Sequence, residues 1–187
     1  PDVEGTYAYD AERAAALLSE AGWTDSDGDG IRDRDGEPLR LEAILMGWGY
    51  IPEVGQMMQH QLKQVGVDMR SREMTFSNAL GEVADGDYHL IPFLFSSSDP
   101  DIIRTTFHSS NIEGGFNWSK FSDSQLDTWL DEGEQEMDPA RRRQIYAEIQ
   151  QRIMEQAIIV PIRDYVNLNA AQAGVQGLRY DRQGWFP

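Results

Sequence analysis

Residues 138–168 read DPARRRQIYAEIQQRIMEQAIIVPIRDYVNL, and this stretch organises our interpretation of the whole chain. Asp138 is expected to cap a helix, with Pro139 at the first helical position, where a backbone N–H is not needed. The apolar stripe of this helix, at helical spacing, consists of Ile145, Tyr146, Ile149, Ile153 and Met154. The segment therefore predicts a surface helix with one buried side.

The residues after this helix predict a strand. Residues 157–160 (AIIV) are apolar without alternation, which is typical of a strand covered on both faces. Pro161 cannot donate to a ladder of hydrogen bonds, so it should lie at an edge or at a strand end. Residues 165–169 alternate between apolar and polar, as expected where the strand leaves the core.

Length and composition favour a globular protein. With 187 residues, 40% of them apolar and five of them Trp, the chain can form a core, and we predict a single domain over residues 1–187. No run approaches the roughly 18 apolar residues that a membrane span requires. The chain begins at Pro1 without an initiator Met, so we expect a mature or excised segment.

The net charge of the chain and its lack of cysteine exclude several kinds of partner and site. Acidic residues outnumber basic ones 32 to 16, for a net charge of −16, which repels a phosphate backbone. We therefore expect no nucleic acid partner. The absence of cysteine excludes disulfides, thiolate metal sites and cysteine nucleophiles.

The remaining elements predict an α/β fold. Strands are expected at residues 39–46, 67–73 and 87–95, separated by helices at 52–66 and 75–84. Such an order favours a largely parallel sheet, because parallel strands need helical crossovers. Further helices are expected at 9–23, 99–107 and 123–136, with a loop at 109–121 and a last strand at 173–180.

Catalytic signatures are absent from the sequence, and we interpret the chain as a protein that is not an enzyme. His60, His89 and His108 lie far apart, and none belongs to a metal-binding doublet. No Ser lies in a nucleophile elbow or a phosphate-binding loop. Pairs of carboxylates exist, but they arise by chance among 32 acidic residues.

One acidic loop could hold a metal ion. Asp25, Asp27 and Asp29 alternate with small residues, and carboxylates spaced in this way can surround a calcium ion with oxygen atoms. Gly36 stands where a calcium-binding EF-hand needs a bidentate Glu, so a solvated hairpin is the competing interpretation. The sequence requires no cofactor, and it allows a structural calcium ion in this loop.

Aromatic and polar residues after the predicted strands form the candidate ligand site. In an open α/β sheet, ligands bind outside the carboxyl ends of the strands. The predicted ligand-binding residues are Trp48, Tyr50, Phe93, Phe95, Ser96, Asn117 and Trp118, with Phe116 beside the last two. The alternative is that these aromatic residues fill the core.

Six segments in succession resemble the C-terminal lobe of the family 5 extracytoplasmic solute-binding proteins, the peptide, nickel and opine receptors of ABC importers. The resemblance extends from Tyr9 to Gly177, and the order of the segments makes it specific. The segments are YDAERAAALLSEAGW (9–23), DGDGIRDRDGEPLRLE (27–42), QLKQVGVDM (61–69), GDYHLIPFLFSSSDPD (86–101), GFNWSKFSDSQLDTWLDEG (115–133) and DPARRRQIYAEIQQRIMEQAIIVPI (138–162).

This resemblance implies a periplasmic-binding-protein-like lobe with a mixed, mostly parallel sheet flanked by helices. It implies a peptide or small-molecule ligand, a missing N-terminal lobe and an ABC transporter permease as partners, and a location in the periplasm or on a cell-surface lipoprotein. Phe93 matches a position where an aromatic residue flanks the ligand, and Asn117 one near the cleft. Ser96 replaces an Asp that often pairs with the α-amino group of a peptide.

Two other functions remain open at this point. A calcium-stabilised extracellular interaction module is the main alternative, because of the acidic loop. A carboxylate-based hydrolase would need two acids roughly 5–10 Å apart across a cleft, and the sequence does not place such a pair.

Overall fold

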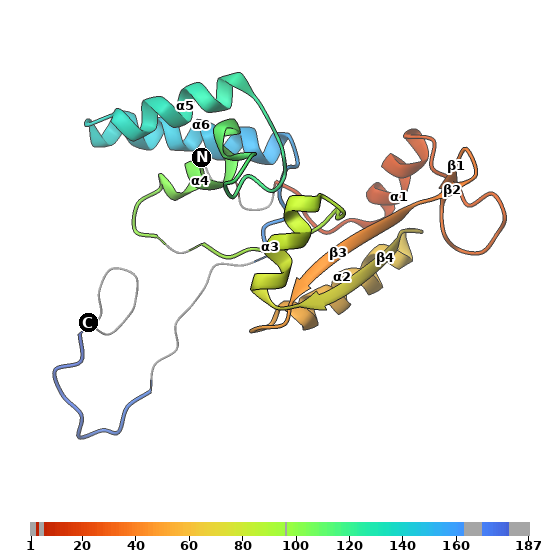
Figure 1. The fold of residues 1–187 in the computed structure, drawn as a ribbon, viewed down its shortest axis with the longest axis horizontal. Coiled ribbons are helices and arrows are strands. Elements are labelled where there is room, and N and C mark those ends of the chain that lie inside the picture. The colour runs from red at the N-terminus through yellow and green to blue at the C-terminus, as the bar shows by residue number, and fades with distance from the viewer. Residues whose placement is uncertain (1–2, 4–5, 96, 163–169, 180–187) are drawn as a thin grey trace. The chain divides into compact units, whose positions relative to one another are not determined.

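A computed structural model describes residues 3, 6–95, 97–162 and 170–179 of the chain (Figure 1). Its contacts divide into two compact units. We call Tyr7–Leu94 the sheet unit, and Pro1–Thr6 with Phe95–Pro187 the helical unit. The α/β fold class is confirmed, whereas the single domain expected over residues 1–187 stays a prediction. In the described part of the chain, no helix is long and apolar enough to cross a membrane.

The sheet unit is built on two parallel strands, β3 (Arg40–Met46) and β4 (Asp68–Met74), connected by the helix α2 (Ile51–Gln64). Their register pairs Arg40 with Asp68 at one end and Met46 with Met74 at the other. The helical crossover brings both strands into the same direction, as their sequence order predicts. Both carboxyl ends therefore lie at the same edge of the sheet.

The prediction of a third strand at residues 87–95 is wrong, because no regular strand forms there. Only Leu90 forms a parallel bridge, with Ala43, and its carbonyl accepts a 2.9 Å hydrogen bond from the Ile44 N–H. Pro92 has no N–H to donate, so a ladder cannot continue past this point. The chain reaches this bridge from α3 (Phe76–Asp85), which ends at the left-handed Gly86.

The two faces of the small parallel sheet are covered by different helices. Gly55 of α2 lies against Leu45, with so little space that a Cβ on Gly55 would come 2.3 Å from a Leu45 methyl carbon. Ile44 and Met46 point to the opposite face, because side chains alternate along a strand. They share a buried cluster with Ala79 of α3.

The amino-terminal part of the sheet unit holds the remaining predicted elements. The helix α1 (Ala11–Glu20) begins at Asp10, whose carboxylate accepts a 2.8 Å hydrogen bond from the Arg13 N–H. The acidic loop then leads into an antiparallel hairpin of β1 (Asp33–Arg34) and β2 (Glu37–Pro38). The turn residues of this hairpin, Asp35 and Gly36, have φ values of 56° and 82°, as the tight turn requires.

The helical unit consists of α4 (Ile102–Phe107), a short 3₁₀ helix η1 (Ser109–Asn111), α5 (Ser124–Gln135) and α6 (Pro139–Glu155). The helices α5 and α6 lie side by side (Figure 1). The apolar stripe predicted for α6 is confirmed, because all five of its residues are buried. The core cluster consists of Phe107, Leu126, Leu130, Ile145, Tyr146, Ile149 and Ile153.

One carboxylate joins the start of α5 to the end of α6. Asp123 caps α5 by accepting hydrogen bonds from the N–H groups of Gln125 and Leu126. Its other oxygen accepts hydrogen bonds from Arg152 at 2.9 and 2.6 Å. The Arg152 guanidinium and these backbone donors hold the pKa of Asp123 below its ordinary value.

The strand predicted after α6 is wrong over the residues that the structure describes. Residues 157–162 form no strand, and Ala157 has a φ of 49°. Ile159, Val160 and Ile162 are 40%, 64% and 49% exposed, although burial on both faces was expected. A strand needs a neighbour, and no described strand lies beside this apolar segment. Residues 165–169 lie outside the described residues, and residues 173–179 form no strand.

Candidate functional site

The predicted ligand-binding residues fall in both units. Trp48, Tyr50 and Phe93 belong to the sheet unit. Phe95, Asn117 and Trp118 belong to the helical unit. Ser96 lies outside the described residues.

In the sheet unit, aromatic residues gather after the carboxyl ends of the parallel strands. Trp48 comes two residues after β3 and is 43% exposed, while Tyr50 is half-buried at the start of α2. Phe93 packs against the sheet core, and its ring centroid lies 6.2 Å from that of Phe76. Sequence reasoning missed Phe76, although its position two residues after β4 gave the same signal as that of Trp48.

In the helical unit, three aromatic rings form a row. The centroids of Phe95 and Phe116 are 5.8 Å apart with an edge-to-face angle of 86°. Trp118 continues the row at 5.6 Å from Phe116. Edge-to-face and tilted contacts of this kind stabilise aromatic pairs beyond simple burial. The structure thus brings together two residues of the predicted set, Phe95 and Trp118, through Phe116.

Asn117, between two of these rings, is fully buried and holds the loop together. Its amide nitrogen donates hydrogen bonds to the backbone carbonyls of Phe107, His108 and Phe121 at 3.4, 3.2 and 2.9 Å. Its amide oxygen accepts a 2.8 Å bond from the Ser119 hydroxyl. The polar atoms of Asn117 are therefore used inside the loop, and they fix the backbone that carries the flanking aromatic residues.

Two side chains of α6 hold the turn that follows Ser96. Arg142 pairs with Asp99 at 2.8 Å, and the Tyr146 hydroxyl donates a 2.7 Å hydrogen bond to Asp101. The pKa of Asp99 is lowered by the Asp101 N–H and by Arg142, whereas burial and the bond to Asp101 raise the pKa of Tyr146. Two open hollows, of about 370 and 590 Å³, adjoin this turn and share Arg142.

Sequence reasoning missed this pair of contacts. Arg142 and Tyr146 are four residues apart, so they occupy one face of α6, and the guanidinium lies 5.0 Å from the centre of the Tyr146 ring. The spacing was visible in the sequence, but the carboxylates that they hold lie 43 and 45 residues away. Only the fold shows that these groups meet.

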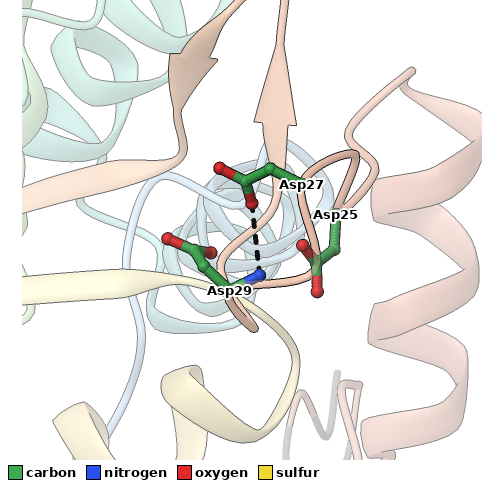
Figure 2. Close-up of side chains that lie close together, drawn as sticks. All are labelled: Asp25, Asp27 and Asp29. Atoms are coloured by element: carbon green, nitrogen blue, oxygen red, sulfur yellow. Dashed lines mark hydrogen bonds between the residues drawn. The ribbon is translucent and has the colours of Figure 1, made fainter.

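The acidic loop brings its three carboxylates together at the surface. One carboxylate oxygen from each of Asp25, Asp27 and Asp29 lies within 4.8 Å of the other two, and all three residues are exposed (Figure 2). The loop also satisfies these carboxylates itself: Asp25 accepts from two glycine N–H groups, and Asp27 from the Asp29 N–H at 3.2 Å. The arrangement is compatible with a hard cation and with a solvated turn.

The three histidines have local structural partners. His89 accepts a 3.0 Å hydrogen bond from the Glu42 N–H, and His108 accepts a 3.1 Å bond from the Ser110 N–H. His60 lies 3.1 Å from the side-chain amide of Gln64 on the same helix. The Ser110 hydroxyl also lies 2.7 Å from Nδ1 of His108, which caps the 3₁₀ helix η1.

Comparison with known protein sequences gives consistent matches. A sequence profile of the bacterial extracellular solute-binding proteins, family 5 Middle, matches residues 1–114. The oligopeptide-binding protein AppA of Bacillus subtilis is 26% identical over 152 residues, which cover 80% of this chain and 28% of AppA. The nickel-binding periplasmic protein of Escherichia coli is 26% identical over 172 residues, covering 86% of this chain and 31% of that protein.

A solved structure agrees with these matches. The structure of AppA in complex with a nonapeptide has a TM-score of 0.72 with this chain at 25% identity, covering 80% of this chain and 30% of AppA. The chain spans less than a third of the length of each of these relatives. The periplasmic-binding-protein-like fold expected from the sequence is therefore confirmed.

Proposed function

Because this chain belongs to the bacterial extracellular solute-binding proteins of family 5, we propose that it forms one wall of the ligand site in the substrate-binding component of a peptide-type ABC importer. This proposal rests on the match between the family profile and residues 1–114. The family consists of solute-binding proteins, so the chain binds without covalent chemistry. Its place is outside the cytoplasm, in the periplasm or on a cell-surface lipoprotein, where it delivers ligand to a permease.

The other wall comes from residues beyond this chain. The relatives are more than three times as long as the part that matches, which leaves room for an N-terminal lobe. The exposed apolar segment Ile159, Val160 and Ile162 supports this proposal, because such a surface favours burial against another part of the protein. A ligand enclosed between two lobes buries far more surface than either lobe offers alone.

Ligand contacts come from aromatic groups in each unit. In the sheet unit these are Trp48 and Tyr50, which follow β3, and Phe93, which follows the isolated bridge of Leu90. In the helical unit they are Phe95 and Trp118, with Asn117 fixing the loop between the rings and Ser96 preceding the turn held by α6. Aromatic faces suit the mixed apolar and polar surface of a peptide.

Calorimetric titration of the full-length protein tests the ligand class. We expect saturable binding of short peptides, and no binding of maltohexaose or of a nickel–histidine complex at the same concentrations. Peptide binding is expected because oligopeptide-binding AppA matches the chain in both sequence and fold. Saturable binding of the sugar or the nickel complex alone would reject the peptide assignment and keep the receptor class.

We propose that the acidic loop keeps its shape without a bound cation. Its carboxylates already accept N–H groups of the loop, so removing free calcium with EDTA is expected to change the melting temperature by less than about 1 °C. Differential scanning calorimetry in EDTA and in millimolar calcium measures the difference. A decrease of several degrees in EDTA, absent in an Asp25→Asn variant, would instead support the calcium-stabilised interaction module, a class not found among the relatives described above.

A further inference from the structure

One carboxylate at the carboxyl edge of the parallel sheet has no assigned role. Glu73 is the last residue but one of β4 and is exposed. The ladder between the strands continues past their ends, because the Gly47 N–H donates a 3.2 Å hydrogen bond to the Met74 carbonyl. Gly47 and Trp48, just beyond β3, therefore lie beside the end of the strand that carries Glu73.

Gly47 makes room for this carboxylate. A Cβ built on Gly47 would come 2.5 Å from the Oε1 atom of Glu73. Gly47 does not have a positive φ, so its backbone conformation does not require glycine. The missing side chain allows the carboxylate to lie against the backbone directly before Trp48, a residue that is 43% exposed.

The basic residues on the same strand are already paired elsewhere. Arg72 bonds to Glu82 at 2.5 Å and donates to the Asp87 carbonyl, and Arg70 bonds to Asp68. Within the part of the chain that the structure describes, Glu73 has no hydrogen-bond or ion-pair partner. The start of α2 also has no side-chain cap, so Glu73 does not serve that helix. Its negative charge remains available.

We propose that Glu73 and Trp48 form a subsite for a cationic group of the ligand, an ammonium or a guanidinium. A carboxylate supplies charge-assisted hydrogen bonds, and an exposed indole attracts a cation to its face. The net charge of −16 further favours cations near the protein. This inference rests on the proposed function and specifies the chemistry that one end of the site selects.

Matched peptides test the subsite in the full-length protein. The probes are tetra-alanine with a free or an acetylated amino terminus, and acetylated tetrapeptides that carry either lysine or norleucine among alanines. Norleucine keeps most of the methylene chain and removes the ammonium group. The free and acetylated tetra-alanines report on a terminal ammonium, and the other pair reports on a side-chain ammonium.

We expect the wild type to bind the cationic member of at least one pair about tenfold more tightly, which corresponds to about 1.4 kcal/mol. Glu73→Gln should reduce that ratio to nearly one, and Gly47→Ala should reduce it in part, because the added methyl group displaces the carboxylate. Glu37→Gln, an equal charge change in the exposed strand β2 at the other end of β3, should leave the ratio unchanged.

The possible outcomes separate this inference from the proposed function. Equal affinities within both pairs, or a ratio that survives Glu73→Gln, would overturn the cationic subsite while leaving a peptide receptor. If none of the four peptides binds to the wild type, both the proposed peptide function and the inference that rests on it are rejected.

Discussion

Replacing Asn117 with leucine is expected to lower the free energy of unfolding by about 2–4 kcal/mol, because one buried and two partly buried carbonyl groups lose their donor. Leucine has the same number and branching of side-chain heavy atoms as asparagine, although its methyl groups are larger, so the loop stays filled while the hydrogen bonds disappear. The Ser119 hydroxyl also loses its acceptor. Urea denaturation of the chain, followed by circular dichroism, measures the change.

Two further variants separate the contributions to this loss. Asn117→Ala removes the same bonds without adding bulk and leaves a cavity instead, so a loss of similar size in both variants would attribute it to the missing hydrogen bonds. Asn78→Ala is the matched control, because Asn78 is exposed on α3, and its effect should stay within about 0.5 kcal/mol. Equal stability of Asn117→Leu and the wild type would show that the amide hydrogen bonds of Asn117 do not hold the loop.

This chain alone is expected to bind a peptide at least about 100-fold more weakly than the full-length protein, a difference of about 2.7 kcal/mol. The reason is that its surfaces are open: Trp48 is 43% exposed, and the hollows beside residues 99–101 lie at the surface. A peptide on one open wall buries only part of its surface and makes only part of its contacts. Isothermal titration of one peptide into both proteins gives the ratio.

A folding control must accompany this comparison. The isolated chain should show cooperative urea unfolding before its affinity is measured, so that weak binding is not caused by unfolding. Equal affinity of the folded chain and the full-length protein would contradict the second wall. In that case the site would lie entirely within the residues of this chain.

The sequence predicted local features of the fold well. Asp138 caps α6 as expected, because a cap depends on residues only two or three positions away. The periodic apolar stripe of α6 is buried as predicted, and β3 and β4 have the predicted positions and direction. These features share signals that extend over a few neighbouring residues.

The failures concern features that depend on distant partners. The apolar pattern at residues 157–160 resembles a strand, yet a strand forms only when a neighbour supplies hydrogen bonds, and none lies beside it in the described residues. The pairing of Arg142 with Asp99 and the approach of Glu73 to Gly47 join residues 43 and 26 positions apart. Single-sequence patterns contain no information on such pairs.

The double role of Asp123 makes the α5–α6 pair sensitive to acid at one point. Its carboxylate has a lowered pKa, so its stabilising effect is complete above the ordinary value of 3.8 and disappears as the pH falls towards the lowered one. Protonation weakens the cap of α5 and the link to Arg152 in the same step. Loosening of the two helices would then begin at this one end of their contact, where a single proton acts on both interactions.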